Sequence, residues 1–131
     1  MSKTVKVAAA VIERGGDVLV CSRPDGDAMC GKWEFPGGKL EPGESFAEAL
    51  RRELSEELAI ADVTVLDTLG RAGFCRPDKT VVIRFLRCRL PESQTITPQE
   101  GQKFRWVGRR ELRRIDFLPA DRDFVIRLSG F

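Results

Sequence analysis

The sequence predicts a single α/β domain in which a few helices accompany a mixed β-sheet. Three observations support this class: the length, a series of apolar runs of strand length, and one well-capped helix among them. The chain has 131 residues, which suits one domain, and 42% are hydrophobic against 32% charged. That balance provides a core and excludes a disordered chain. We therefore expect one domain over residues 1–131.

Two apolar runs near the N-terminus predict a β-hairpin. Residues 3–14 are rich in valine, two glycines then signal a turn, and residues 18–21 are apolar again. Residues 24–32 have the composition of a loop, and residues 33–35 form a short aromatic segment. Residues 36–38, Pro-Gly-Gly, are expected to end regular structure.

The clearest helix follows this loop. Ser45 is a good N-cap and Glu48, three residues later, completes a capping box, so a helix is expected from there to about Ala59. The remaining expected elements are one or two strands in 61–75, a strand at 81–90, a loop at 91–101, a strand at 104–107, a short helix at 111–115 and a C-terminal helix from Pro119 to about Leu128. Hairpin strands with interspersed helices favour a mixed-sheet α/β fold.

Two absences restrict the chemistry. The chain has no histidine and no tyrosine, which excludes serine–histidine–aspartate triads, H-E-x-x-H zinc sites and histidine bases. Its four cysteines show no C-x-x-C spacing, so no zinc ribbon or redox pair is indicated. Hydrolysis would then depend on carboxylates, lysine, arginine and metal ions, and oxygen ligands favour Mg²⁺ or Mn²⁺.

Charge and hydropathy restrict the partners. The net charge is +2, and the one dense basic run, residues 109–114, is interrupted by Glu111. A solvated helix face is the preferred interpretation of that run, so no nucleic-acid polymer is expected. No stretch approaches the roughly 18 apolar residues of a membrane span, and the N-terminus lacks the pattern of a signal peptide. We expect a cytoplasmic protein without a membrane partner, present as a monomer or homodimer.

Three glutamates are crowded on the predicted helix. Glu53, Glu56 and Glu57 fall within an arc of roughly 100°, and Glu53 and Glu57 lie at the edge of the apolar face. Two carboxylates about 5 Å apart repel by roughly 3 kcal/mol at an effective dielectric of 20, and divalent cations would relieve that repulsion. The helix alone leaves open a second interpretation, a solvated acidic helix with Arg51 and Arg52 as partners.

The preceding loop favours the metal interpretation. Gly37 and Gly38 allow a backbone carbonyl to face a metal ion, and Lys39 is long enough to reach a phosphate. Glu41 and Glu44 add carboxylates just before the helix. The loop is not a Walker loop, because the G-x-x-x-x-G-K-[ST] pattern is absent.

This stretch resembles the Nudix box, G-x5-E-x7-R-E-U-x-E-E-x-G-U, in which U is a bulky aliphatic residue. Within residues 38–60 the matching positions are Gly38, Glu44, Arg52, Glu53, Leu54, Glu56, Glu57 and Ile60. The one departure is Ala59, where the pattern has glycine. That position ends the helix, so we expect a slightly strained C-cap and no loss of chemistry.

The resemblance continues outside the box, toward the MutT-type nucleoside triphosphate pyrophosphohydrolases of the Nudix hydrolase family, in the branch that acts on CTP or 8-oxo-dGTP. The segments that carry it are Arg23-Pro24, residues 33–38, residues 100–102 and residues 118–121. The resemblance implies a Nudix-type α/β/α sandwich with a mixed sheet. It also implies Mg²⁺-dependent hydrolysis of a nucleoside triphosphate to the monophosphate and pyrophosphate, for nucleotide-pool sanitation or CTP turnover.

The resemblance also implies residue roles. The metal ligands would be Glu53, Glu56, Glu57, Glu100 and the Gly37 carbonyl, with Mn²⁺ able to replace Mg²⁺. Glu100 would be either a ligand or the base for the attacking water, and Arg52 would orient a glutamate of the box. Substrate contacts would come from Arg23 and Lys39 at the phosphates, Phe35 and Asp121 at the base, and Glu34. An ionised aspartate at position 121 offers only acceptors, which suits an exocyclic amine such as that of cytosine.

Two alternatives remain at this point. One is hydrolysis of another nucleoside diphosphate-linked compound, such as ADP-ribose or a dinucleoside polyphosphate, although the short chain leaves little extra material to hold a second half. The other is a non-catalytic nucleotide-binding module on the same fold, which the full set of box glutamates disfavours.

Overall fold

The computed structural model describes residues 3–24 and 26–130. Seven strands form one sheet whose main path runs β3-β2-β1-β6-β5, with β4 paired to β1 and β7 paired to β2. β1 and β6 are parallel and the other pairs are antiparallel, so the sheet is mixed as predicted. The strands are β1 (Lys3–Arg14), β2 (Asp17–Ser22), β3 (Trp33–Glu34), β4 (Gly37–Lys39), β5 (Thr64–Cys75), β6 (Lys79–Arg89) and β7 (Phe104–Gly108).

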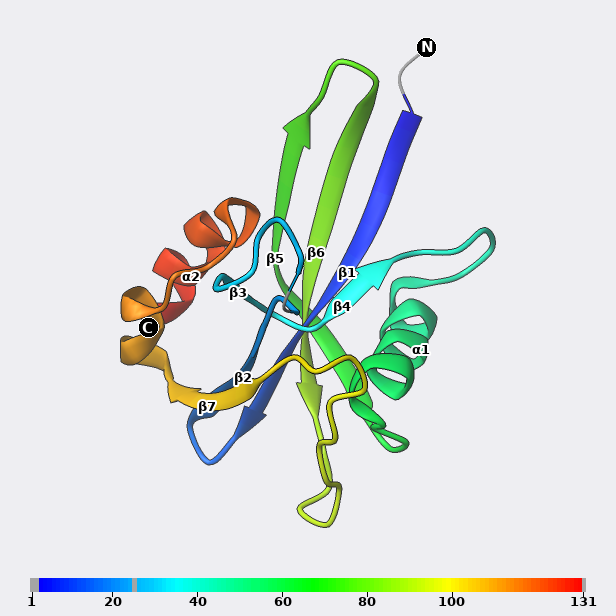
Figure 1. The fold of residues 1–131 in the computed structure, drawn as a ribbon. Helices are drawn as coiled ribbons and strands as arrows, with labels where there is room; N and C mark the ends of the chain where they lie inside the picture. Colours follow the sequence, from blue (N-terminus) through cyan, green and yellow to red (C-terminus); the bar gives the residue numbers. More distant parts are fainter. Residues whose placement is uncertain (1–2, 25, 131) are drawn as a thin grey trace.

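Helices cover both faces of the sheet. Figure 1 shows α1 (Phe46–Leu58) on one side, and on the other side η1 (Arg109–Arg114), η2 (Pro119–Asp121) and α2 (Arg122–Ser129). In β1, Ala8, Ala10 and Ile12 face the core under α1, whereas Ala9 and Val11 face the core under α2. The central strand is therefore apolar on both faces, which explains its nearly unbroken apolar sequence. The expected α/β/α arrangement is confirmed.

The predicted capping box of α1 is present. The Glu48 backbone N–H donates to Ser45 Oγ at 3.1 Å, and the Ser45 N–H donates to Glu48 Oε1 at 2.9 Å. At the other end, Ala59 adopts a left-handed conformation with φ of 54°, and its N–H donates to the Ser55 carbonyl. The strained C-cap expected from alanine in place of glycine is thus observed.

The expected break at residues 36–38 is wrong, because Gly37–Lys39 form β4. The Ala10 N–H donates to the Pro36 carbonyl at 2.8 Å, and the Leu40 N–H donates to the Lys6 carbonyl at 2.9 Å. These ladder bonds come from a strand distant in sequence, so local turn propensity did not reveal them. Of the one or two strands expected in 61–75, one irregular strand is present, at residues 64–75.

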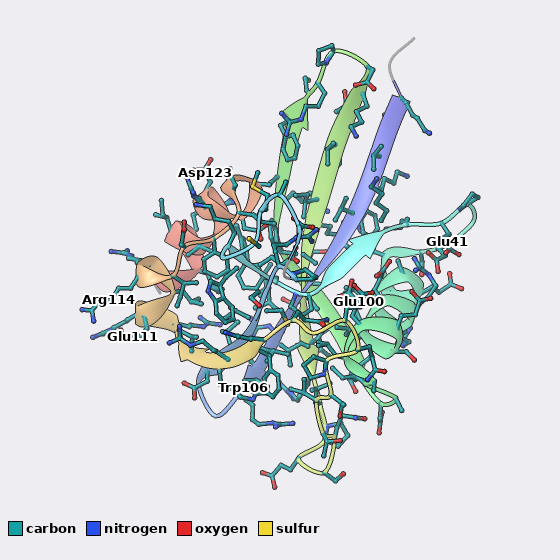
Figure 2. All side chains as sticks on the ribbon, in the orientation of Figure 1. Glu41, Glu100, Trp106, Glu111, Arg114 and Asp123 are labelled. Carbon is teal, nitrogen blue, oxygen red and sulfur yellow. The ribbon has the colours of Figure 1, made fainter. Side chains whose placement is uncertain are left out.

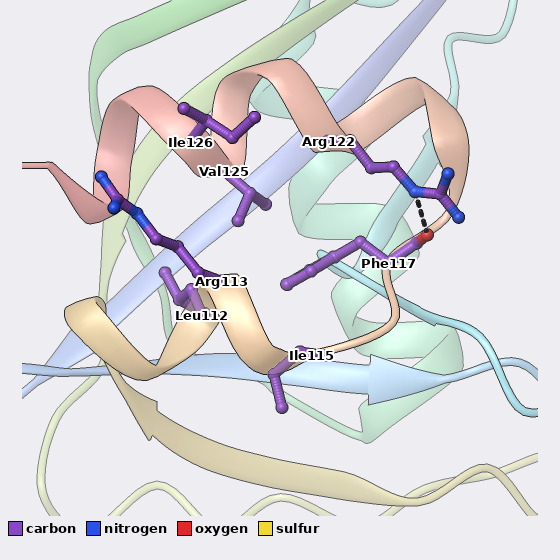
Figure 3. A pocket seen from close by; sticks show the side chains of 7 residues that line it. All are labelled: Leu112, Arg113, Ile115, Phe117, Arg122, Val125 and Ile126. Atoms are coloured by element: carbon purple, nitrogen blue, oxygen red, sulfur yellow. Dashed lines mark hydrogen bonds between the residues drawn. The ribbon is translucent and has the colours of Figure 1, made fainter.

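The two C-terminal helical segments begin as 3₁₀ turns. The predicted helix at 111–115 is a 3₁₀ helix that starts at Arg109, and Pro119 opens a 3₁₀ turn that continues into α2. Leu112 of η1 and Val125 of α2 lie in the space between the two segments, and Arg122 Nε donates to the Phe117 carbonyl at 3.1 Å (Figure 3). Among the described residues, none of the helices has the length and apolar character needed to cross a membrane.

Candidate functional site

Two glycines bring β4 under the acidic helix. A Cβ on Gly38 would lie 2.5 Å from the carboxylate carbon of Glu53, so only glycine leaves room for that carboxylate. Gly37 has φ of 148°, and a Cβ there would lie 2.0 Å from the Ala8 carbonyl oxygen. Both positions therefore require glycine, the first for side-chain space and the second for backbone conformation.

The Gly37 carbonyl is free of the β1 ladder. The bonds at Pro36 and Leu40 belong to the hydrogen-bonded pairs of the antiparallel ladder, and the register Ala9↔Gly37 places Gly37 between such pairs. In an antiparallel ladder the peptide groups of the intervening residue point away from the partner strand. The structure therefore directs this carbonyl away from β1, as a metal ligand at this position would require.

Glu57 is the most perturbed carboxyl of the helix. Its pKa is raised to about 8, first by burial, then by a hydrogen bond that its protonated form donates to Glu53, and then by the like charges of Glu53, Glu34 and Glu100. Glu53 is also largely enclosed, with a side chain that is 17% exposed. The two glutamates at the edge of the apolar face thus lie together, as the helical spacing predicts. The crowding favours a proton or a cation between them.

A cleft of about 130 Å³ opens beside Glu57. Its lining comes from the end of β2, the loop after it, β3 and the segment before β7, and comprises Cys21, Ser22, Arg23, Pro24, Asp27, Glu34, Pro36, Glu57, Glu100 and Gln102. Glu100 is exposed at this cleft, in the segment that passes α1 (Figure 2). Four of the predicted site residues, Arg23, Glu34, Glu57 and Glu100, are therefore brought to one small cleft.

The segment before β7 is fastened to the C-terminal end of α1. Gln102 Nε2 and the Gln99 N–H donate to the Glu57 carbonyl at 3.2 and 2.9 Å, and the Thr97 N–H donates to the Leu58 carbonyl at 2.9 Å. These donors satisfy carbonyls that the helix end leaves free. Gln102 also accepts from the Glu100 N–H, so it fixes the backbone of Glu100. Sequence reasoning missed Gln102, because no local pattern signals a partner 45 residues away.

Arg23 is tied to two carboxylates of the cleft. Its terminal nitrogens donate to Glu34 Oε2 at 2.9 Å and to Asp27 Oδ2 at 2.6 Å. Burial raises the pKa of Glu34, and the Arg23 guanidinium opposes that rise. Asp27 was not expected in the site, since its segment has only the composition of a loop. Arg23 thus lies at the cleft, with its charge already shared between two acids.

Asp121 and Phe35 lie deeper than expected. Phe35 is 4% exposed and stacks on Phe117 at 5.2 Å between ring centroids, so its ring is part of the core. Asp121 is 7% exposed. Burial and, to a lesser degree, the charge of Glu34 raise its pKa against a hydrogen bond from the Phe35 N–H, and the resulting pKa is about 7. The pair meets through that backbone contact, and neither residue lines the acidic cleft.

Arg52, in the middle of α1, forms an ion-pair network that reaches the loop before the helix. Arg52 donates from Nε and Nη2 to the two oxygens of Glu44 at 2.8 and 2.9 Å, and from Nη1 to Glu53 at 2.9 Å. It also donates to the Lys39 carbonyl at 2.9 Å. Glu56 lies 3.6 Å from Arg52 but is 61% exposed, outside the enclosed pair of glutamates. Arg52 thus holds Glu53 against the loop, as expected for an orienting residue.

Lys39 is not brought to the cleft. Its side chain is exposed and lines a separate groove with Lys3, Lys6 and residues 40–44. Within residues 3–24 and 26–130, no three acidic or cysteine side chains lie close enough, as placed, to hold a metal ion. The structure therefore shows a pair of crowded carboxylates with a third at the cleft, all of them hard oxygen donors of the kind that Mg²⁺ and Mn²⁺ prefer.

Comparisons with known proteins agree with this architecture. The NUDIX domain family matches residues 2–128. The chain is 38% identical over 120 residues to the CTP pyrophosphohydrolase of Escherichia coli (strain K12), covering 91% of this chain and 87% of that protein. It is 36% identical over 125 residues to the putative 8-oxo-dGTP diphosphatase 2 of Mycobacterium tuberculosis (strain ATCC 25618 / H37Rv), covering 94% and 86%.

A solved structure shows the same fold. The solution structure of the E. coli ORF135 protein superimposes with a TM-score of 0.85 at 32% sequence identity, covering 98% of this chain and 91% of that one. The glycine-led strand, the acidic helix and the matches over nearly the whole length lead to one conclusion: the chain belongs to the Nudix hydrolase family.

Proposed function

We propose that this chain is a magnesium-dependent pyrophosphohydrolase that converts a nucleoside triphosphate to its monophosphate and pyrophosphate. Enzymes of the family generally use a divalent metal and bind small nucleotides. The observation that carries the proposal is the crowding of Glu57 against three other carboxylates, those of Glu53, Glu34 and Glu100. Burial and these neighbours raise the pKa of Glu57 to about 8. A divalent cation would neutralise these carboxylates and relieve their mutual repulsion.

The groups that would hold Mg²⁺ or Mn²⁺ are the carboxylates of Glu53, Glu56, Glu57 and Glu100 and the Gly37 carbonyl. Three features support this set: every donor is oxygen, the Gly37 carbonyl faces away from β1, and glycine at position 38 leaves space beside Glu53. When bound, the cation would neutralise phosphate oxygens and lower the pKa of the attacking water.

The residues of the chain would supply position and proton transfer. Arg52 fixes one oxygen of Glu53, and its bidentate contact with Glu44 holds the guanidinium in place. Glu100 is exposed at the cleft with its backbone fixed by Gln102, so it is placed to accept a proton from water that enters there. Phosphoryl transfer is catalysed mainly by positioning of the reactants and by stabilisation of charge, so no covalent nucleophile is required.

Phosphate contact would require a change at Arg23. Both of its terminal nitrogens donate to carboxylates, so a triphosphate would compete with Glu34 or Asp27 for this guanidinium. Lys39 would act from the neighbouring groove along β4 rather than from within the cleft. A phosphate with several charges can compete because guanidinium–phosphate contacts are bidentate and charge-assisted.

We propose that the preferred substrate is CTP or 8-oxo-dGTP, the triphosphates that appear in the names of the relatives. Asp121 was expected to offer only acceptors, but burial raises its pKa to about 7, which makes the protonated carboxyl accessible near neutral pH. It therefore offers a donor as well as an acceptor. Phe35 supports this carboxyl from the core through its backbone N–H.

A nucleotide panel tests the proposal. CTP, dCTP, 5-methyl-dCTP, dGTP, 8-oxo-dGTP, ADP-ribose and a dinucleoside tetraphosphate are compared by kcat/KM with and without Mg²⁺, and products are assigned by phosphorus NMR. We expect Mg²⁺-dependent release of pyrophosphate and a monophosphate from at least one triphosphate. Release of inorganic phosphate from the γ position, or turnover of ADP-ribose alone, would refute it.

A further inference from the structure

A second charged cavity lies on the α2 side of the sheet. It has a volume of about 370 Å³ and is lined by Leu69 of β5, Arg87 of β6, Arg109 of η1, and Phe124, Arg127 and Leu128 of α2. None of these residues lines the acidic cleft beside α1. The cavity is therefore separate from the site to which the hydrolysis is assigned.

Three guanidinium groups in this cavity share little negative charge. Glu13 bridges two of them, at 3.1 Å from Arg87 and 2.8 Å from Arg109. Asp67 lies 3.3 Å from Arg87 but is 65% exposed. Such an exposed contact contributes little. One enclosed carboxylate thus stands against three cations.

Hydrogen-bond donors in the cavity are left without strong acceptors. Arg87 Nε is buried and makes no well-aligned hydrogen bond within the described residues, although Asp67 Oδ1 lies 3.3 Å from it. Glu13 Oε1, 3.1 Å from Arg87 Nη1, is likewise a buried atom without a hydrogen bond. Arg127 donates only to the Arg71 carbonyl, at 3.5 Å, and no carboxylate of the described residues lies within 4.0 Å of it. The guanidinium donors that face the cavity are therefore only partly used by groups of the protein, and an anion in the cavity would accept from those that remain.

The remaining walls are apolar. Leu128 and Phe124 are buried core residues at the base of α2, and Leu69 is packed against the same core. A guanidinium cluster fits a phosphate, because its planar forks donate bidentately to phosphate oxygens. An apolar wall beside it fits a ring or short hydrocarbon on that phosphate, and the volume lies in the lower range of small-molecule sites.

We infer that this cavity binds a phosphate monoester that carries a compact apolar group. Arg87, Arg109 and Arg127 hold the phosphate, and Leu69, Phe124 and Leu128 contact the apolar group. Binding leaves the acidic cleft open, because the two sites share no lining residue. The ligand therefore need not be the substrate of the hydrolase.

Methyl NMR of the full chain tests this site directly. Phenyl phosphate, inorganic phosphate and benzoate are titrated separately in EDTA, so that metal-dependent binding at the acidic cleft does not contribute. We expect phenyl phosphate to shift the methyl signals of Leu69 and Leu128 saturably below about 10 mM, leaving Leu50 and Leu54 of α1 unchanged. Inorganic phosphate and benzoate should each bind at least about fivefold more weakly.

Variants separate the cavity from general surface charge. Arg127→Gln removes the guanidinium that is not paired with Glu13 and should weaken phenyl phosphate binding about tenfold. Arg110→Gln, an exposed neighbour that does not line the cavity, is the matched control and should bind as the wild type does. Pyrophosphate release by either variant under low-phosphate conditions should stay at the wild-type rate.

Several results would overturn the inference. They are the absence of saturable binding, an equal loss of affinity in the Arg110 control, and shifts confined to methyl groups outside the cavity. Benzoate binding as tightly as phenyl phosphate would show that a carboxylate is the preferred anion. Inorganic phosphate binding as tightly would show that the apolar walls take no part. Because binding is measured without metal or turnover, failure here is distinct from failure of the hydrolase proposal.

Discussion

The two ends of α1 hold glutamates of the same chemistry in opposite electrostatic states. At the N-terminal end, hydrogen bonds from Arg52, followed by one from the Glu41 N–H, hold the pKa of Glu44 at about 2. At the C-terminal end, burial and three neighbouring carboxylates raise the pKa of Glu57 to about 8. No arginine or lysine of the described residues lies within 4.0 Å of Glu57.

This difference separates a carboxylate with a structural role from the carboxyl that we propose takes part in the reaction. Glu44 is a carboxylate whose charge is fully used inside the protein, since both of its oxygens accept from Arg52. Glu57 is a carboxyl whose ionised form is disfavoured by burial and by neighbouring carboxylates, and a bound cation would remove that penalty. Arg52, in the middle of α1, donates to Glu44 in the loop before the helix, whereas Glu57 near the C-terminal end is buried among other carboxylates.

The largest effect is expected at the reactive end. Glu57→Gln keeps the shape of the side chain and removes the charge, so kcat should fall by about 10²–10⁴-fold. Glu92→Gln, in an exposed loop, is the matched control and should leave kcat unchanged. Steady-state pyrophosphate release measures both, and near-normal turnover in the Glu57 variant would remove the distinction between the two ends.

Substitution of Glu44 is expected to lower stability more than turnover. Glu44→Gln breaks the bidentate contact with Arg52, so the melting temperature should fall by several degrees while much of kcat is retained. Thermal unfolding and kinetics on the same preparation separate the two readouts. A loss of kcat as large as that of Glu57→Gln, without a change in melting temperature, would place Glu44 in the chemistry.

The glycine under Glu53 gives the next effect. A Cβ at position 38 meets the Glu53 carboxylate at 2.5 Å, so Gly38→Ala should displace it and lower kcat by about 10²-fold. Gly108→Ala is the matched control, because its Cβ would meet only ordinary contacts at 3.7 Å or more. Equal activity of the two variants would show that the position of Glu53 does not matter.

The pH dependence of stability should follow from the raised pKa of Glu57. Between its ordinary value of 4.5 and about 8, the folded protein keeps a proton that the unfolded chain releases. Metal-free stability must then fall as pH rises through this window, by about 1–3 kcal/mol. Urea unfolding of wild type and Glu57→Gln from pH 5 to pH 8 checks this, since the variant should lack that decline.

The smallest effect is expected at the helix end. Ala59→Gly relieves a left-handed alanine and should stabilise the fold by about 0.5–1 kcal/mol, after the greater chain entropy of glycine is counted. Activity should stay at the wild-type level. A destabilised variant would mean that the methyl group of Ala59 makes a contact that outweighs its strain.

The sequence was most informative where the physics is local. The capping box at Ser45, the strand at residues 3–14 and the crowding of Glu53 and Glu57 all follow from spacing along one element, and the structure confirms them. The strained cap at Ala59 was likewise expected from a single residue.

The sequence was least informative where partners are distant. β4 exists because β1 supplies its ladder bonds, and Gln102 reaches α1 from a segment 45 residues away. Phe35 was expected beside the base, but three other aromatic rings enclose it in the core. The side chain of Lys39 lines a separate groove on β4 rather than the acidic cleft. Each outcome depends on packing that no local pattern encodes.

Calorimetric titration with Mg²⁺ or Mn²⁺ in the presence of a non-hydrolysable triphosphate analogue tests the central claim most directly. At a pH below 8, the wild type should take up the metal and release a proton, detected by repeating the titration in buffers of different ionisation enthalpy. Glu57→Gln should bind far more weakly and release none. Folded wild-type protein that takes up neither metal, or a variant that binds as well with the same proton release, would contradict the account.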